Sequence, residues 1–288
     1  MEPILKWAGG KRNLLPILTK LIDMSGFDSK KNRYYEPFIG GGALCFYETF
    51  PRCTINDFNE ELINVYRQIK EHPLEVIDLL KKHAALHSKS YYLSVRAMDR
   101  ESNYAMFDGT VRAARIIYLN RTCYNGLYRV NKNGYFNVPM GKYKSPEIVM
   151  EERILSLSEY LSKKDVSILQ GDFEKSVRYA KAGDLIYFDP PYDYDGSGFS
   201  TYTAKGFNRD DLNRLKRLSD RLVEKGCIVL ISNNETNYVK DLFDTPFYTT
   251  HRVQASRFIS CDGKRRNKVD EVIIYGRKPV ENSISAGK

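Results

Sequence analysis

No part of this sequence is apolar over a length that spans a lipid bilayer. The longest apolar runs, such as residues 227–231, have the length of a buried strand, whereas a membrane helix needs about 20 apolar residues. The residues that follow Met1 contain no apolar signal region. These absences argue against an integral membrane protein and a secreted protein, and we expect a cytoplasmic one.

Cysteine pairs with the spacing of a metal or redox site are also missing. The five cysteines are odd in number and none stands in a Cys-x-x-Cys motif; they are Cys45, Cys53, Cys123, Cys227 and Cys261. Such a set is typical of reduced thiols rather than a disulfide scaffold or a zinc site.

The chain has 288 residues, 42% of them apolar, and a net charge of +9 at pH 7. That length fits one core domain with a sizeable insertion better than two full domains. The positive charge favours a polyanionic partner such as nucleic acid, although solvated lysines on an ordinary surface would give the same balance.

Predicted strands and helices alternate near both ends of the chain. Residues 32–36, a glycine turn and the apolar stretch 44–50 predict a strand, a turn and a helix, and residues 53–57 predict the next strand. Further strands are predicted at 166–169, 185–188, 227–232, 249–253 and 269–275, with a helix at 209–225. The alternation predicts an α/β fold with a doubly wound, mostly parallel sheet and helices on both faces.

Residues 58–161 interrupt this alternation. Helical apolar spacing occurs at 62–69, 74–80 and 111–119, and residues 128–138 predict a β-hairpin around Asn131-Lys132-Asn133-Gly134. We therefore predict a discontinuous core domain (1–57 and 162–277), an inserted helical domain bearing a β-hairpin (58–161), and a C-terminal tail (278–288).

The tetrapeptide Asp189-Pro190-Pro191-Tyr192 carries the strongest chemical signal. It follows an apolar strand, at the carboxyl end where open α/β sheets bind ligands. The prolines fix the backbone and remove two N–H donors, which leaves nearby carbonyls free to accept. An exocyclic amine is a poor nucleophile because its lone pair is delocalised into the aromatic ring. A carboxylate and a carbonyl that accept its N–H bonds would free that lone pair, while Tyr192 stacks on the base.

Catalysis of this kind would come from positioning and electrostatics, without a metal or a covalent intermediate. The alternative is that the tetrapeptide is only a rigid turn after a strand.

A glycine turn supplies a candidate cofactor site. Phe38-Ile39-Gly40-Gly41-Gly42 follows a predicted strand and opens a helix, so its backbone can approach a ligand closely. Asp57, at the end of the next strand, stands where a carboxylate would bind ribose hydroxyls. NAD-binding proteins share this spacing, but their G-x-G-x-x-G form is absent because position 45 is Cys.

Two weaker signals accompany the glycine turn. Asp172 and Phe173 end a predicted strand and offer an acid and an aromatic ring to an adenine, or form a polar loop with a core phenylalanine. Trp7 and Lys11 flank two glycines in a segment that can approach a small anion such as a methionine carboxylate. A tryptophan buried for packing is the alternative.

Residues 112–144 contain no Asp or Glu. Basic and aromatic side chains alternate there: Arg112, Arg115, Arg121, Arg129, Lys132, Lys142 and Lys144 with Tyr118, Tyr124, Tyr128, Tyr135, Phe136 and Tyr143. Basic groups neutralise phosphates, aromatic rings and asparagines replace an extruded base, and an arginine on a hairpin pairs with guanine. Lys264 and Arg265, between the last two predicted strands, are a second basic candidate. A solvated hairpin is the alternative.

In their type and order, these motifs resemble those of the Dam family of DNA adenine-N6 methyltransferases. The resemblance covers the chain from Trp7 to about Arg277. The matching segments are residues 6–11, 36–43, 56–59, 125–129, 136–139, 171–173 and 189–192. The resemblance implies a Rossmann-like core that binds S-adenosylmethionine and an insertion that recognises double-stranded DNA. It also implies a flipped adenine, usually within GATC.

The resemblance assigns residues to each role. Trp7, Lys11, Asp57, Asp172 and Asp189 would contact S-adenosylmethionine, joined by Phe38, Gly40, Gly42 and Phe173 from the motifs above. Asp189, Pro190 and Tyr192 would engage the flipped adenine. Arg129 would read a guanine, Pro139 would touch a thymine methyl, and Tyr124 and Asn125 would fill the space left by the base. The expected DNA-binding set is completed by Arg121, Leu127, Asn137, Lys264 and Arg265.

Two other interpretations stay open: an amino-methyltransferase acting on cytosine N4 or on RNA, and a non-catalytic nucleic-acid-binding protein. The latter would not need the glycine turn, Asp57 and Asp-Pro-Pro-Tyr together. Cytosine C5 methylation is excluded, because it uses a thiolate usually placed beside a proline and no cysteine here follows one. His83 and His87 lack a third ligand, so we expect no metal site. The sequence does not set an oligomeric state.

Overall fold

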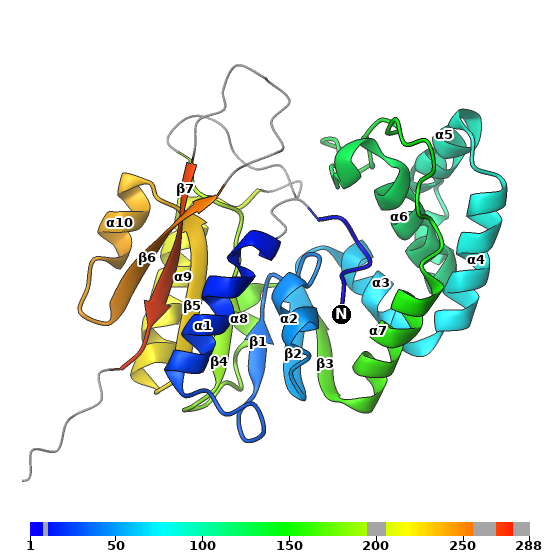
Figure 1. Cartoon of the computed structure of the whole chain (residues 1–288). Helices are drawn as coiled ribbons and strands as arrows, with labels where there is room; N and C mark the ends of the chain where they lie inside the picture. The colour runs from blue at the N-terminus through cyan, green and yellow to red at the C-terminus, as the bar shows by residue number, and fades with distance from the viewer. Residues whose placement is uncertain (8–10, 195–205, 256–268, 279–288) are drawn as a thin grey trace, which may run out of the picture.

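A seven-stranded sheet forms the centre of the computed structural model, which describes residues 1–7, 11–194, 206–255 and 269–278 (Figure 1). The strand order is β3-β2-β1-β4-β5-β7-β6. The strands are β1 (Tyr34–Glu36), β2 (Arg52–Asp57), β3 (Asp165–Gln170), β4 (Leu185–Phe188), β5 (Ile228–Asn234), β6 (Tyr248–Ala255) and β7 (Val269–Gly276). The first five are parallel neighbours, so the predicted α/β fold with a mostly parallel sheet is confirmed.

Strand β7 runs against the others. It pairs antiparallel with β5 on one side and with β6 on the other. Parallel neighbours need a crossover connection, usually a helix, whereas antiparallel neighbours do not. Strands β6 and β7 follow each other along the chain, which agrees with their antiparallel pairing.

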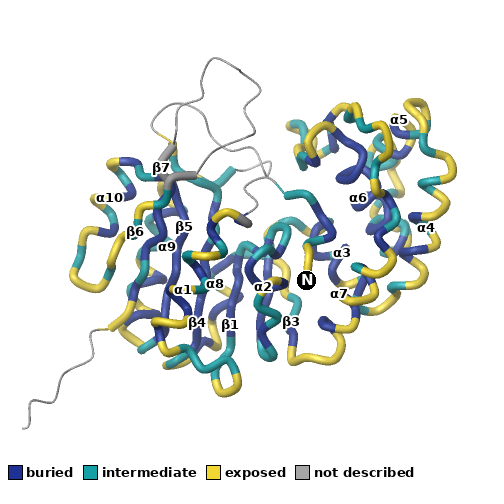
Figure 2. The backbone as a smooth tube through the Cα atoms, in the orientation of Figure 1, coloured by how far each residue is buried: buried dark blue, intermediate teal, exposed yellow. Residues whose placement is uncertain are grey.

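Helices cover both faces of the sheet, because strand side chains alternate between them. Leu185 and Tyr187 of β4 belong to one hydrophobic cluster, and Ile186 and Phe188 belong to the other. The first cluster is shared with α1 (Leu15–Ser25) and α2 (Ala43–Glu48), and the second with α8 (Phe173–Ser176), α9 (Arg209–Glu224) and α10 (Asn237–Phe243). In Figure 2 the central strands are accordingly buried, with exposed residues on the outer helices.

Helices α3 to α7 lie between β2 and β3 in the sequence, although these strands are direct neighbours in the sheet. They are α3 (Glu60–Glu71), α4 (Pro73–Ala85), α5 (Lys89–Ala97), α6 (Gly109–Thr122) and α7 (Glu151–Lys163). The helical spacings predicted at 62–69, 74–80 and 111–119 fall within α3, α4 and α6.

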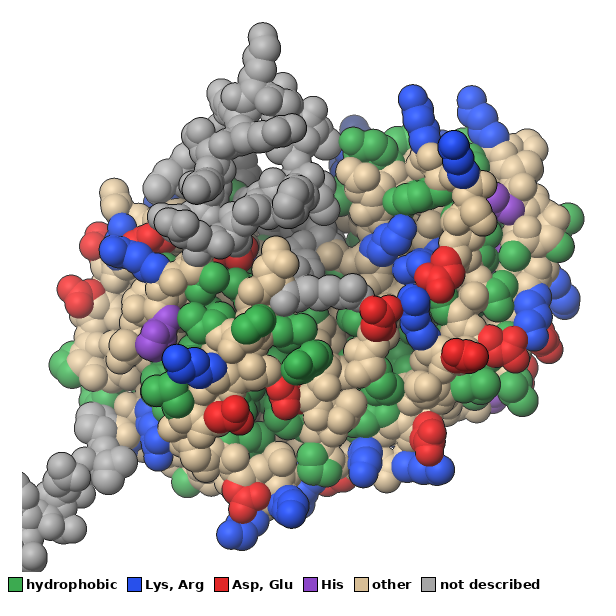
Figure 3. Space-filling model, viewed as in Figure 1, with side chains coloured by type: hydrophobic (Ala, Val, Ile, Leu, Met, Phe, Trp, Pro, Cys, Tyr) green, Lys and Arg blue, Asp and Glu red, His purple; other side chains and the backbone are tan. Residues whose placement is uncertain are grey.

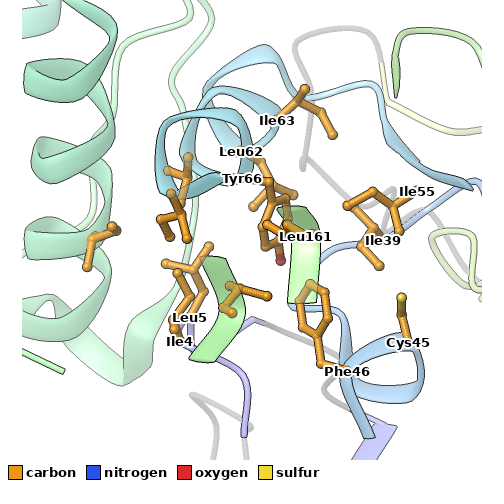
Figure 4. Packing of buried hydrophobic residues seen from close by; sticks show 14 of the residues in the cluster. Ile4, Leu5, Ile39, Cys45, Phe46, Ile55, Leu62, Ile63, Tyr66 and Leu161 are labelled. Carbon is orange, nitrogen blue, oxygen red and sulfur yellow. The ribbon is translucent and has the colours of Figure 1, made fainter. Parts of the chain in front are cut away.

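These helices share their hydrophobic core with the sheet. Ile4 and Leu5, near the amino terminus, belong to the same cluster as Leu62 and Tyr66 of α3 and Leu161 of α7 (Figure 4). In Figure 1 the amino terminus accordingly lies between the sheet and these helices.

The predicted hairpin at 128–138 forms a turn without regular strands. Val130 and Phe136 make an isolated antiparallel bridge, and the Asn137 amide donates to the Arg129 carbonyl at 3.1 Å. The side chain of Asn131 accepts from the backbone of Asn133 and of Tyr135. Asparagine side chains that bond the backbone in this way stabilise the turn itself, and the Asn131 amide donates to the Tyr135 carbonyl at 2.9 Å. The chain therefore doubles back as predicted, but the two flanking strands do not form.

Among the described helices, none combines the length and the apolar character needed to cross a membrane.

Candidate active site

The glycine turn and the Asp-Pro-Pro-Tyr segment follow neighbouring strands. Strands β1 and β4 pair in parallel, with Tyr34 opposite Leu185, and the two motifs come directly after their carboxyl ends. Successive strands extend the sheet in one direction from β1 and in the other from β4. This is the topological switch point where open α/β sheets bind ligands.

Asp189 is held through one of its two carboxylate oxygens. Ser232 donates its hydroxyl proton to Oδ1 at 2.8 Å, and the Lys11 ammonium lies 3.2 Å from the same oxygen. Among the described residues, no group bonds to Oδ2. Burial raises the pKa of this carboxyl, and Lys11 and Ser232 oppose that shift by favouring the charged form. The site thus presents a restrained carboxylate with one oxygen available.

Lys11 connects Asp189 to Tyr192. It begins the short 3-10 helix η1 (Lys11–Leu14), and its ammonium lies 3.9 Å from the centre of the Tyr192 ring. Its side chain is 8% exposed, so both interactions are shielded from water. The first and last residues of Asp189–Tyr192 are therefore held by the same cation.

Ser232, at the end of β5, was not identified from the sequence. Because its hydroxyl donates to Asp189, the Tyr187 hydroxyl, 2.9 Å away, donates to Ser232. The signal that could have found it is the polar run 232–234 at the end of an apolar strand, beside the strand that carries Asp189.

Glu36 connects the end of β1 to the glycine turn. It is buried, and it accepts hydrogen bonds from the Tyr34 hydroxyl at 2.7 Å and the Cys45 amide at 3.2 Å. Burial raises its pKa well above the usual value, and the nearby Asp189 carboxylate adds to the shift. Its bond to Cys45 fixes the start of α2 directly after the turn.

Two positions of the turn accept only glycine. Gly40 and Gly42 have φ angles of 47° and 70°, in the left-handed region. A Cβ atom on Gly40 would lie 2.8 Å from the indole of Trp7, and one on Gly42 would lie 2.2 Å from the Phe46 ring. The bare backbone of the turn is therefore required by packing as well as by its conformation.

Trp7 lies between this turn and Tyr128. One side of its indole faces Gly40, and the ring stacks on Tyr128 with centroids 5.4 Å apart. The preceding residue is fixed to α6, since Asn120 exchanges two hydrogen bonds with the Lys6 backbone at 2.8 and 2.6 Å. The indole of Trp7 is thus partly buried against the core, and it also borders the glycine turn.

Asp57 ends β2 beside the glycine turn. Its carboxylate accepts from the Gly40 amide at 3.1 Å and from the Asn59 amide at 2.9 Å. Part of its surface reaches solvent, but loss of hydration outweighs these bonds and raises its pKa to about 6. The carboxyl thus lies directly beside the backbone of the glycine turn.

Asp172 and Phe173 have local structural roles. Asp172 caps α8 by accepting from the Glu174 amide, and its other oxygen accepts from Arg214 at 2.8 Å. Phe173 is buried in the core and stacks on the more exposed Phe38 with centroids 5.3 Å apart. The core-phenylalanine alternative therefore describes Phe173, and Phe38 has the more accessible ring.

Four predicted DNA-binding residues are exposed: Tyr124, Asn125, Arg129 and Pro139. The Arg129 guanidinium is oriented by Asn137, whose side-chain oxygen accepts its Nε–H at 2.7 Å. In Figure 3, Lys and Arg side chains gather at the upper end of the part that holds α5 and α6. The turn therefore presents a restrained arginine to solvent beside exposed aromatic and amide groups.

Two other basic residues of the acid-free stretch, Arg121 and Arg115, are buried and paired with acids. Arg121 is buried and donates to the backbone and carboxylate of Glu147 at 2.9 and 2.6 Å. Arg115 is 1% exposed and pairs with Asp99. Leu127 is partly buried against the core. Lys264 and Arg265 lie outside the described residues.

The two histidines weighed as metal ligands each bond to a tyrosine. His83 Nδ1 lies 2.9 Å from the Tyr91 hydroxyl, and His87 Nδ1 lies 2.9 Å from the Tyr118 hydroxyl. No cluster of three His, Cys, Asp or Glu side chains suited to a metal ion occurs in the part of the chain that the structure describes.

Known proteins match this chain along nearly its whole length. The family model described as D12 class N6 adenine-specific DNA methyltransferase matches residues 7–259. The chain belongs to this family. It is 44% identical over 281 residues to type II methyltransferase M1.LlaDCHI of Lactococcus lactis subsp. cremoris, covering 96% of each chain.

Other relatives of this methyltransferase come from two further organisms. Type II methyltransferase M.MjaIII of Methanocaldococcus jannaschii is 37% identical, with 95% of this chain and 98% of the relative covered. The DNA adenine methylase of Vibrio cholerae is 33% identical, with 93% and 94% covered. The resemblance to the Dam family is confirmed, and the protein is an adenine-specific DNA methyltransferase.

Proposed function

We propose that this methyltransferase transfers the methyl group of S-adenosylmethionine to adenine N6 in double-stranded DNA, at a base flipped out of the helix, with GATC as its target. The observation that carries the proposal is the restrained carboxylate of Asp189, which keeps Oδ2 available at the switch point beside the glycine turn. Both features lie at the carboxyl ends of the central strands β1 and β4, where the cofactor and the base would meet.

Asp189 and Pro190 would activate the amine. Oδ2 of Asp189 and the carbonyl oxygen of Pro190 accept the two N6–H bonds, so the nitrogen lone pair turns out of the ring and becomes nucleophilic. S-adenosylmethionine supplies an electrophilic sulfonium methyl when it is bound. As the new N–C bond forms, Asp189 stabilises the positive charge that develops on N6, and its raised pKa suits it to take the departing proton.

The residues around the glycine turn fit this cofactor. The backbone at Gly40 and Gly42 carries no side chain, which permits close approach, and Asp57 offers acceptor oxygens for ribose hydroxyls. Trp7, Lys11 and the exposed side of Phe38 would border the rest of the molecule. Asp172 follows the carboxyl end of β3 and would border the cofactor there, although one of its oxygens already accepts from Arg214.

Cofactor affinity should depend on pH through Asp57. Its pKa is about 6 in the free protein, so it becomes neutral as the pH falls below that value. Ribose hydroxyls donate more strongly to the charged carboxylate, so affinity should rise with pH through about 6 and level off above it. Calorimetric titration with S-adenosylmethionine between pH 5 and 8 measures this. Asp57→Asn should bind more weakly and lose the dependence; an unchanged pH profile in that variant would remove Asp57 from the cofactor site.

For DNA recognition we propose that residues 58–161 form the target-recognition domain and that 1–57 with 162–277 form the catalytic domain, followed by a tail at 278–288. The support is the exposed set Tyr124, Asn125, Arg129 and Pro139 around one turn. Tyr124 and Asn125 would fill the gap left by the flipped base, and Pro139 would contact a thymine methyl. Arg121 would contribute by holding this region through Glu147.

Arg129→Ala should relax sequence discrimination at one base pair. An arginine that pairs with guanine contributes about 1–3 kcal/mol of discrimination, which corresponds to roughly a 5- to 150-fold loss in specificity ratio. Methylation rates on duplexes that differ at each target position measure this. Arg178→Ala is the matched control, because Arg178 is also exposed but lies in the segment that precedes β4, at the amino end of that strand. If Arg129→Ala keeps full discrimination, another residue reads the guanine.

Transfer of a labelled methyl group to duplexes with and without GATC, followed by nucleoside analysis, tests the proposal. We expect N6-methyladenine, formed on GATC duplexes alone. N4-methylcytosine, or methylation of RNA only, would support the neighbouring amino-methyltransferase classes. Methylated adenine in duplexes that lack GATC would replace the proposed target with another.

A further inference from the structure

The segment Asp189–Tyr192 has few backbone N–H groups that could fix its conformation through hydrogen bonds. Pro190 and Pro191 carry no N–H, so neither can donate a hydrogen bond. Stacking on a base nevertheless needs the Tyr192 ring within a fraction of an ångström of one position. The restraint must therefore come from groups beside the segment.

Side chains from neighbouring elements converge on the next residue, Asp193. Its amide donates to the Asn233 side chain at 2.9 Å, and its carbonyl accepts from the Asn234 side chain at 2.7 Å. Its carboxylate accepts from Thr236 at 2.7 Å and from Arg209 through two bonds at 3.0 and 3.1 Å. Backbone and side chain of this residue are thus fixed together.

These partners come from rigid parts of the fold. Asn233 and Asn234 end the fully buried strand β5, Thr236 caps α10, and Arg209 begins α9. The Asp193 side chain is only 9% exposed, whereas that of Arg209 is 48% exposed, so water screens the arginine pair more than the bond from Thr236. A bidentate arginine–carboxylate pair also fixes orientation, which a single charge contact does not.

Tyr192 is consequently restrained from both directions. On one side, Lys11 bridges it to Asp189, which β5 holds through Ser232. On the other side, Asp193 is held by the end of the same strand. We infer that Asp193 is a positioning residue for methyl transfer: it sets the Tyr192 ring where the target base stacks. This inference rests on the role proposed above for Tyr192.

A residue that only stabilises the fold would weaken every activity together, whereas a positioning residue affects one step. Asp193→Ala should therefore lower the single-turnover rate of methyl transfer by about 10- to 100-fold. Affinity for S-adenosylmethionine alone should stay within about twofold of the original, because no bond of Asp193 reaches the glycine turn or Asp57. Asp220→Asn is the matched control: Asp220 also pairs with a cation and a hydroxyl, Lys216 and Tyr248, and should leave the rate unchanged.

A double-mutant cycle tests whether Asp193 acts through Tyr192. In a Tyr192→Ala background the ring is gone, so adding Asp193→Asn should change the rate by less than about twofold. Asp193→Asn is isosteric and keeps the bond from Thr236 while losing the charge that Arg209 pairs with. It carries the test even if Asp193→Ala does not fold, and alone it should reduce the rate several-fold.

Two results would overturn the inference: full rates in the Asp193 variants, or reductions that multiply with that of Tyr192→Ala. A full rate in Tyr192→Ala itself is a different failure, because it would remove Tyr192 from the proposed mechanism. The single Tyr192 variant therefore separates the two ideas.

Discussion

Replacing Asp189 by alanine should nearly abolish methyl transfer while leaving DNA affinity largely unchanged. The carboxylate is expected to act on the amine during reaction rather than to hold the duplex. Loss of one preorganised electrostatic partner typically costs about 100- to 1,000-fold in rate, and here the proton acceptor is lost as well. Single-turnover transfer of a labelled methyl group and binding of a GATC duplex give the two quantities.

Asp189→Asn is the informative companion variant. It keeps the shape and one acceptor oxygen but removes the charge, so its rate should fall between that of the original protein and that of Asp189→Ala. The original rate should also decline at low pH, as the carboxyl protonates at a pKa above its ordinary value. Asp189→Asn should lose that decline. Full activity in Asp189→Ala would exclude the carboxylate from the reaction.

Replacing Asp99 by alanine should lower the free energy of unfolding more than any other substitution proposed for this protein. Asp99 is 10% exposed, and its Oδ2 lies 2.9 Å from the guanidinium of Arg115, itself 1% exposed, and accepts from the Phe136 amide at 2.7 Å. Removing one partner of a buried ion pair typically costs about 3–5 kcal/mol, because the other charge stays buried without compensation. Urea unfolding followed by circular dichroism measures the free energy of unfolding.

Two further variants identify the cause of that loss. Arg100→Ala removes an exposed cation 3.5 Å from the other oxygen of Asp99 and should cost less than about 1 kcal/mol. The double variant Asp99→Ala with Arg115→Met should be more stable than Asp99→Ala alone, because it no longer buries a lone charge. A loss below about 1 kcal/mol in Asp99→Ala would show that the pair contributes little. Since Phe136 lies in the turn between Arg129 and Asn137, the same variant should also loosen sequence discrimination.

The sequence predicted the sheet and the location of the site because both depend on local patterns. Apolar runs of strand length, each followed by a glycine turn or an acid, mark buried strands and their carboxyl ends. Gly40, Asp57 and Asp189 therefore could be assigned to one edge of the sheet before any coordinates. In the structure Asp57 ends β2, and Gly40 and Asp189 follow the neighbouring strands β1 and β4.

Partners distant in the sequence could not be predicted in the same way. Ser232 and Asp189 are 43 positions apart and meet only because β5 pairs with β4. The acid-free composition of 112–144 likewise suggested phosphate contacts for Arg115 and Arg121. Their acids, Asp99 and Glu147, lie outside that window, 13 positions before it and three after it, and pair with them in the fold. Local composition reports charge, and tertiary packing decides which charges reach the surface.

The strands predicted beside the turn at 128–138 are reduced to one bridge, between Val130 and Phe136. The Asn131 side chain fixes the turn by accepting from the Asn133 and Tyr135 amides, while the Asn131 amide donates to the Tyr135 carbonyl. The antiparallel direction of β7 depends on pairing across the sheet, which alternation along the chain does not encode.

A crystal structure of the protein with a GATC duplex and an unreactive analogue of S-adenosylmethionine tests the central claim most directly. The account predicts that the target adenine leaves the helix and that its N6 lies within hydrogen-bond distance of Asp189 Oδ2 and the Pro190 carbonyl oxygen, with Tyr192 stacked on the ring. An Asp189 carboxylate turned away from N6, or an adenine still paired within the duplex in a reactive complex, would contradict it.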